Sequence, residues 1–84
     1  MTITHTKIPG VLLITSPKFG DERGFFSEVY KEGVLAEHGF NEVFTQDNHA
    51  YSSEAGVLRG LHYQSPPFAQ DKLVRVVRGS IYDV

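Results

Sequence analysis

The chain has 84 residues, a formal net charge of −2 at pH 7 and no cysteine. A chain of this length holds one domain at most, and its composition is that of a globular protein. The lack of cysteine excludes a disulfide framework and a thiolate metal site, and the charge argues against a nucleic-acid partner. The N-terminus does not resemble a secretory signal, and no apolar run approaches the roughly 20 residues that span a bilayer. We therefore expect a cytoplasmic protein with no membrane partner.

Short apolar runs separated by turn residues mark the first half of the chain. Residues 11–14, between Pro-Gly and Ser-Pro, predict a strand. Residues 19–24 have the composition of a turn, and residues 25–30 predict a second strand. The only helical pattern covers residues 33–38, and Gly39 is well placed to end that helix.

The second half predicts strands at 44–51, at 57–64 and at 73–84, the last as one run or as a hairpin turning at 78–80. Short strands at this density favour an all-β sandwich or barrel. The final residues, 80–84, have the composition of a strand that is cut short.

Several polar residues sit where a plain sandwich core would hold apolar ones. Gln46 and Asn48 share a face of the predicted strand, because alternate residues of a strand point the same way. Arg59 and His62 are three apart and should point to opposite faces. If both serve one site, a bulge at Gly60 could shift the register.

His62, Arg59 and Lys72 together predict chemistry on an anionic carbonyl substrate. A neutral imidazole is available near pH 7 to accept a proton, although a single strand histidine is often structural. A guanidinium can clamp phosphate oxygens, and an ammonium can stabilise the oxyanion of an enolate. Lys72 could equally be a charged residue at the entrance of a strand.

Two residues near the 19–24 turn are weaker candidates. Arg23 is either a solvated turn residue or a fork for phosphate, and Glu28 either faces solvent or accepts a hydrogen bond from a ligand. A metal site is not expected, since His62-Tyr63-Gln64 lacks the second imidazole of a His-x-His pair. No phosphate-cradling glycine loop and no nucleophile elbow are present.

Four strings in order and at matching spacing resemble the dTDP-4-dehydrorhamnose 3,5-epimerase family: FGDERGFFSE at 19–28, QDN at 46–48, VLRGLHYQ at 57–64 and KLVRV at 72–76. The resemblance runs from about Ile8 to Val84. It implies a cupin-like jelly roll (double-stranded β-helix), here its N-terminal part over residues 1–84 with one short helix. It also implies a homodimer at full length that works without metal or other cofactor.

In that family, dTDP-4-dehydro-6-deoxy-D-glucose is converted to dTDP-4-dehydro-L-rhamnose on the route to rhamnose. The resemblance implies His62 as the proton acceptor and Lys72 as the group that stabilises the enolate. It places the dTDP-sugar substrate against six residues: Arg23, Glu28, Gln46, Asn48, Arg59 and Lys72. Glu28 is expected to serve the neighbouring subunit's site.

Family members have roughly twice this length, and their acid tyrosine and the aspartate that orients the histidine lie further downstream. Tyr63 and Tyr82 do not match that acid, so we expect the 84-residue chain alone to be inactive. Two alternatives remain open at this point. One is a related sugar-nucleotide 3-epimerase or ketoisomerase, and the other is a non-catalytic half-domain that binds a nucleotide sugar.

Overall fold

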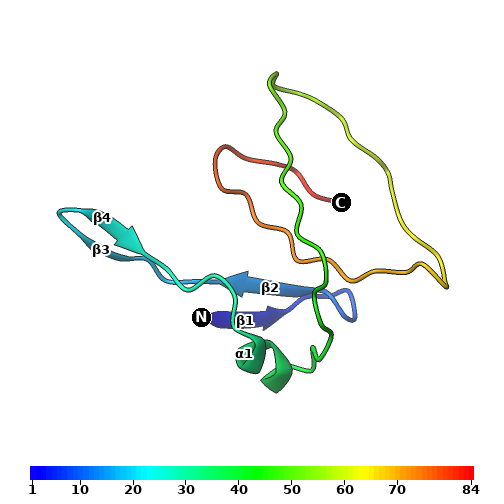
Figure 1. The fold of residues 1–84 in the computed structure, drawn as a ribbon, viewed down its shortest axis with the longest axis horizontal. Coiled ribbons are helices and arrows are strands. Elements are labelled where there is room, and N and C mark those ends of the chain that lie inside the picture. The colour runs from blue at the N-terminus through cyan, green and yellow to red at the C-terminus, as the bar shows by residue number, and fades with distance from the viewer. The chain divides into compact units, whose positions relative to one another are not determined.

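Regular secondary structure is confined to the first half of the chain (Figure 1). The computed structural model describes all residues 1–84, which divide into two units, Met1–Glu42 and Val43–Val84. Four short strands and one short helix occur, all in the first unit, so the all-β class with a single helix is confirmed. No helix has both the length and the apolar character needed to cross a membrane.

An antiparallel hairpin opens the chain. It pairs β1 (Thr2–His5) with β2 (Leu12–Thr15), and Ile3 stands opposite Ile14. Ile3, Leu12 and Ile14 are half-buried while their neighbours are exposed, which gives the hairpin one apolar face. The strand predicted at 11–14 is confirmed within one residue. β1 was not predicted, although the alternation Thr-Ile-Thr is a strand pattern.

A second antiparallel hairpin fills the segment for which we predicted a turn. β3 (Phe19–Asp21) pairs with β4 (Gly24–Phe26), leaving a two-residue loop. Gly24 follows the loop with φ of 134°, a conformation that L side chains rarely adopt and that glycine adopts freely. The strand predicted at 25–30 begins as expected but ends at Phe26.

The helix α1 (Glu32–Glu37) confirms the prediction for 33–38, shifted by one residue. Gly39, at φ of 89°, ends it as expected. The N–H of Gly39 donates to the carbonyl of Ala36, and the N–H of Phe40 donates to the carbonyl of Leu35, which is a Schellman motif. Leu35 is the one buried residue of the chain, with 3% of its surface exposed.

The second unit contains no strand, so the strands predicted at 44–51, 57–64 and 73–84 are wrong for this structure. In Figure 1 this part of the chain is drawn as open loops. Residues 45–84 are all exposed, and none pairs with a neighbouring strand. A β-prone sequence becomes a strand only when another strand satisfies its N–H and C=O groups. The predicted turn at 78–80 survives as a bend, with Gly79 at φ of 88°.

Candidate functional site

The loop between β3 and β4 carries the guanidinium of Arg23, which Asp21 holds in an ion pair. The Asp21 carboxylate accepts three hydrogen bonds from this one residue. Its Oδ1 accepts the backbone N–H of Arg23 at 2.8 Å. Its Oδ2 accepts Nε–H at 3.1 Å and Nη2–H at 2.6 Å. A short loop folds this way because an Asp side chain readily bonds the backbone two residues ahead.

These bonds shift the pKa of both partners. The side-chain bond from Arg23 is the main reason that the pKa of Asp21 lies below its ordinary value of 3.8, and the backbone N–H of Arg23 adds to the effect. The same side-chain bond raises the pKa of Arg23. Both groups therefore keep their charges at neutral pH.

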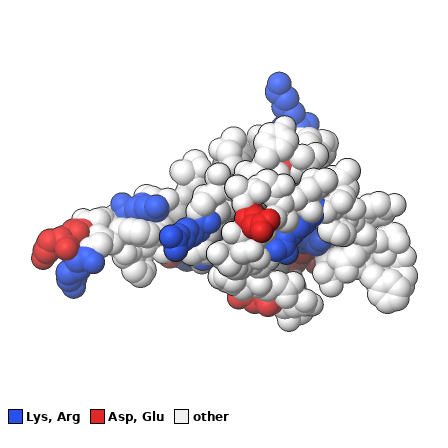
Figure 2. Space-filling view, turned by 90° about the horizontal axis from the view of Figure 1, so that it is seen from above, with Lys and Arg blue, Asp and Glu red and all other residues white.

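A shallow pocket lies along this hairpin, lined by Asp21, Arg23, Gly24 and the three phenylalanines Phe19, Phe25 and Phe26. The phenylalanines are 64%, 64% and 71% exposed, and Lys18 Nζ lies 4.6 Å from the centre of the Phe25 ring. Figure 2 shows acidic and basic side chains next to each other at the tip of this hairpin. Exposed aromatic faces next to a guanidinium can bind a flat ring and a phosphate of one ligand.

The other predicted residue of the first unit is Glu28, which is exposed two residues beyond β4. The remaining predicted residues belong to the second unit. There, Gln46 Nε2 donates to Asn48 Oδ1 at 3.1 Å. The two amides are neighbours, although the strand on which we expected them to share a face is not present.

Arg59 is tied to the segment before it. Its Nη2 donates to the carbonyl of Tyr51 at 2.9 Å and to Ser52 Oγ at 3.0 Å, and its Nε donates to the same hydroxyl at 3.2 Å. A loop of seven residues is thereby closed by one side chain. The acceptors of these bonds are neutral oxygens, so no carboxylate among them competes with an anionic ligand for this guanidinium.

His62 and Lys72 are exposed, and no hydrogen bond or ion pair joins either of them to the other or to Arg59. Gly60 lies between Arg59 and His62 at φ of 120°. It does break the extended run, but the predicted bulge is wrong because no strand is present. A Cβ on Gly60 would lie 3.4 Å from His62 N and 3.5 Å from His62 Nδ1, so a methyl group added here would be in ordinary van der Waals contact with His62.

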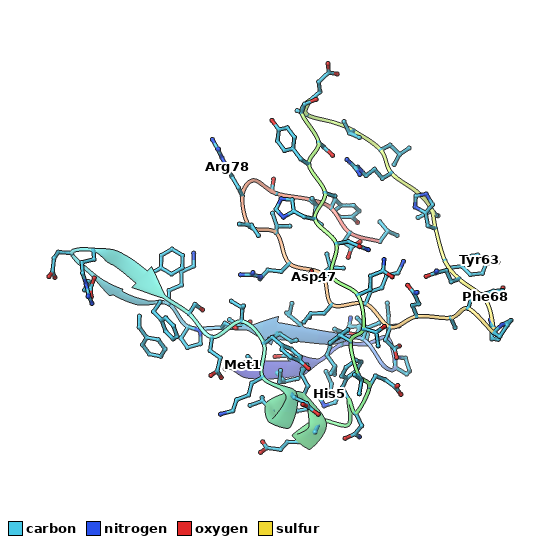
Figure 3. All side chains as sticks on the ribbon, in the orientation of Figure 1. Met1, His5, Asp47, Tyr63, Phe68 and Arg78 are labelled. Atoms are coloured by element: carbon cyan, nitrogen blue, oxygen red, sulfur yellow. The ribbon has the colours of Figure 1, made fainter.

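No three His, Asp or Glu side chains gather where they could hold a metal ion. Figure 3 labels Tyr63, which is the residue after His62, and Phe68. Both side chains project from open chain and are largely exposed, at 89% and 73%.

Our sequence analysis missed two residues that bond to predicted site residues, one in each unit. Asp21 holds Arg23, and Ser52 holds Arg59. The first could have been found, because Asp-x-Arg in a glycine-flanked turn favours a side-chain bond to the backbone. The second could not, because nothing in the sequence pairs a serine with an arginine seven residues later.

The chain matches the family model of dTDP-4-dehydrorhamnose 3,5-epimerase over residues 5–84. It is similar to the curated dTDP-4-dehydrorhamnose 3,5-epimerases of Shigella flexneri and Escherichia coli K12, with 52% and 46% identity over the whole chain. It is 48% identical to the one of Pseudomonas aeruginosa, also over the whole chain. No solved structure matches the chain significantly.

These matches cover 46%, 45% and 46% of the three relatives, so the chain spans about half the length of the curated relatives it matches. The matched region contains every predicted site residue, from Arg23 in the first unit to Lys72 in the second. Because the family model covers nearly the whole chain, this chain belongs to the dTDP-4-dehydrorhamnose 3,5-epimerase family.

Proposed function

We propose that this protein is a nucleotide-sugar epimerase that converts dTDP-4-dehydro-6-deoxy-D-glucose to dTDP-4-dehydro-L-rhamnose. The observation that carries the proposal is the family match over residues 5–84, which includes the histidine, the lysine and both arginines that the reaction needs. The hairpin pocket supports it independently, since phenylalanine faces beside a guanidinium suit a thymine ring and a diphosphate.

Proton abstraction and enolate stabilisation, two steps of the proposed reaction, each have a residue of suitable chemistry within residues 1–84. The C4 ketone acidifies the hydrogens on C3 and C5. His62 accepts one of these protons, the electron pair of the C–H bond moves into the enolate, and the C4 oxygen becomes negative. Lys72 stabilises that oxygen. An acid on the opposite face, which the family resemblance places downstream of residues 1–84, then returns a proton to carbon, and this inverts the centre. His62 must be neutral to act as a base, as an imidazole can be near pH 7.

We assign substrate binding to six side chains, which would contact the nucleotide and the sugar. The two arginines, Arg23 and Arg59, neutralise the diphosphate, because guanidinium groups bind phosphate oxygens in pairs. The carboxylate of Glu28 can accept hydrogen bonds from the thymine ring or the sugars, and the amides of Gln46 and Asn48 can both accept and donate them. The six are Arg23, Glu28, Gln46, Asn48, Arg59 and Lys72.

We further propose that residues 1–84 form the N-terminal part of a single cupin-like jelly roll. In that fold, strands would form where the second unit has β-prone sequence but no partner. The proposal also includes a homodimer in the cytoplasm, with no metal or other cofactor in the reaction.

The test is turnover of dTDP-4-dehydro-6-deoxy-D-glucose by the native gene product, with the product identified by NMR. We expect inversion at both C3 and C5. His62→Ala should lower kcat by about 10²- to 10⁴-fold, the usual contribution of a general base. His49→Ala makes the same chemical change at an exposed histidine to which we assign no role, and it should leave kcat unchanged.

Three outcomes would contradict the assignment. Inversion at C3 alone would indicate a 3-epimerase, and a moved ketone would indicate a ketoisomerase. Binding of dTDP without turnover, unchanged by His62→Ala, would indicate a binding module.

A further inference from the structure

Asp21 is not among the residues assigned to the substrate, yet it makes more bonds to the candidate site than any other side chain of the first unit. Its Oδ2 accepts Nε–H and Nη2–H of Arg23 at 3.1 and 2.6 Å, while its Oδ1 accepts the backbone N–H of the same residue at 2.8 Å. One carboxylate thus fixes both the loop and the arginine side chain that projects from it.

The geometry leaves part of the guanidinium available to a ligand. Of its five N–H donors, the bonds to Asp21 use two, on Nε and Nη2. Both hydrogens of Nη1 and the second one of Nη2 remain, and they lie on the end of the fork that binds phosphate oxygens in pairs. The Arg23 side chain is 84% exposed, so a ligand can reach them, whereas that of Asp21 is 41% exposed.

We propose that Asp21 is a positioning residue, which holds the Arg23 guanidinium so that its Nη1 and Nη2 edge is presented to the diphosphate of the sugar nucleotide. This inference rests on the proposed function, because it takes the ligand to be a diphosphate. A free arginine side chain must lose its rotamer freedom when a ligand binds, and a side chain already held by Asp21 has lost it beforehand.

A second effect of Asp21 opposes the first, and this makes the proposal sharply testable. The carboxylate is negative and lies close to the place where a diphosphate would bind, so charge repulsion alone predicts that its removal improves binding. This position is exposed and repulsion there is screened by water and salt. Positioning therefore outweighs repulsion, and removal of the charge weakens binding.

The experiment compares the native gene product with its Asp21→Asn variant in steady-state turnover of the dTDP-sugar. Asparagine keeps the Oδ1 that accepts the Arg23 N–H, so the loop is retained while the charged bond to the side chain is lost. We expect KM to rise by about 3- to 10-fold, the cost of immobilising one long side chain, with kcat unchanged.

Two controls separate positioning from a general change of charge or structure. Glu22→Gln removes a carboxylate from the same loop that takes no part in the Arg23 bonds, and it should not raise KM. In an Arg23→Lys background, Asp21→Asn should have little further effect, because an ammonium cannot make the two-nitrogen contact. A KM that is unchanged or lower in Asp21→Asn, or equal in both carboxylate variants, would overturn the proposal.

The failure of the proposed function gives a different result. In that case the native protein would not turn over the sugar nucleotide at all. The positioning role is then decided by titration with inorganic pyrophosphate, followed through the Nε–H resonance of Arg23. A weaker Kd in Asp21→Asn than in Glu22→Gln supports it, and equal values refute it.

Discussion

The backbone conformation of Gly60 sets the position of the candidate base His62, and Gly60→Ala is the substitution that tests this. Gly60 has φ of 120°, where an L side chain is strained. The new Cβ would lie 3.4 Å from His62 N and 3.5 Å from His62 Nδ1, which is ordinary van der Waals contact. The cost therefore comes from the backbone conformation and not from a clash.

The size of the effect follows from that distinction. Holding a non-glycine residue in this region costs about 1–3 kcal/mol, so the backbone is expected to turn away from it. Gly60 is two residues before His62, so a change in its backbone dihedral angles would displace the imidazole. A displacement of about 1 Å at a reacting group can lower the rate by roughly 10²-fold. We expect Gly60→Ala to lower kcat of the native gene product by about that factor.

The matched control is Gly33→Ala, because Gly33 lies in α1 with open space around the position of a Cβ. Alanine there should stabilise the helix by about 0.5–1 kcal/mol and leave kcat unchanged. Thermal unfolding and turnover of the dTDP-sugar are measured on both variants. Wild-type kcat in Gly60→Ala would refute the reasoning, since it would show that the Gly60 backbone does not position His62.

Three further predictions follow from the first unit and from the exposed surface. Leu35→Ala should destabilise the first unit by about 2–3 kcal/mol, because Leu35 is 3% exposed and its half-buried surroundings can partly close the space that is left. The control Leu13→Ala should cost under about 1 kcal/mol, because Leu13 is 59% exposed. Equal losses in a hydrogen-exchange comparison would contradict this. The pKa of Asp21 should lie below 3.8 by carboxyl NMR, and Arg23→Gln should raise it toward that value, because the main cause is lost while the backbone N–H bonds remain. Because the folded state lowers the pKa of Asp21, the ion pair with Arg23 contributes fully to stability above pH 3.8, and this contribution is lost as the pH falls through the lowered value. An Asp21 titration midpoint that does not change in Arg23→Gln would refute the pairing. Finally, many large apolar side chains of residues 1–84 are exposed, among them Leu58 at 90%, Leu61 at 86% and Phe68 at 73%. The polypeptide of residues 1–84 should therefore bind an apolar dye and self-associate in sedimentation, and a monomer that unfolds cooperatively without dye binding would contradict this.

The local elements of the first unit could largely be predicted from the sequence. β2 and α1 are recognisable because their signals are contained within a few residues: an apolar run between turn residues, and a short helical pattern ended by Gly39. The hairpin of β3 and β4 was predicted as a turn alone, since three-residue strands carry too little pattern to be distinguished from the loop that joins them.

The second unit shows where local reasoning ends. Its sequence has the alternation and the β-branched residues of strands, as at Val74 and Val76, but a strand also requires a partner. Partners far along the chain are not encoded in any short window. The same limit applies to the site: His62 and Lys72 were identified by residue type and resemblance, and their mutual geometry depends on contacts that no short window of sequence specifies.

The most direct test of the central claim, that His62 begins an epimerisation at two carbons, is hydrogen exchange with solvent during turnover. The native gene product is incubated with dTDP-4-dehydro-6-deoxy-D-glucose in D₂O, and deuterium at C3 and C5 is followed by NMR beside His62→Ala. We predict deuterium at both carbons with the native protein and almost none with the variant. Absence of deuterium from both carbons, or equal incorporation in the two proteins, would contradict the account.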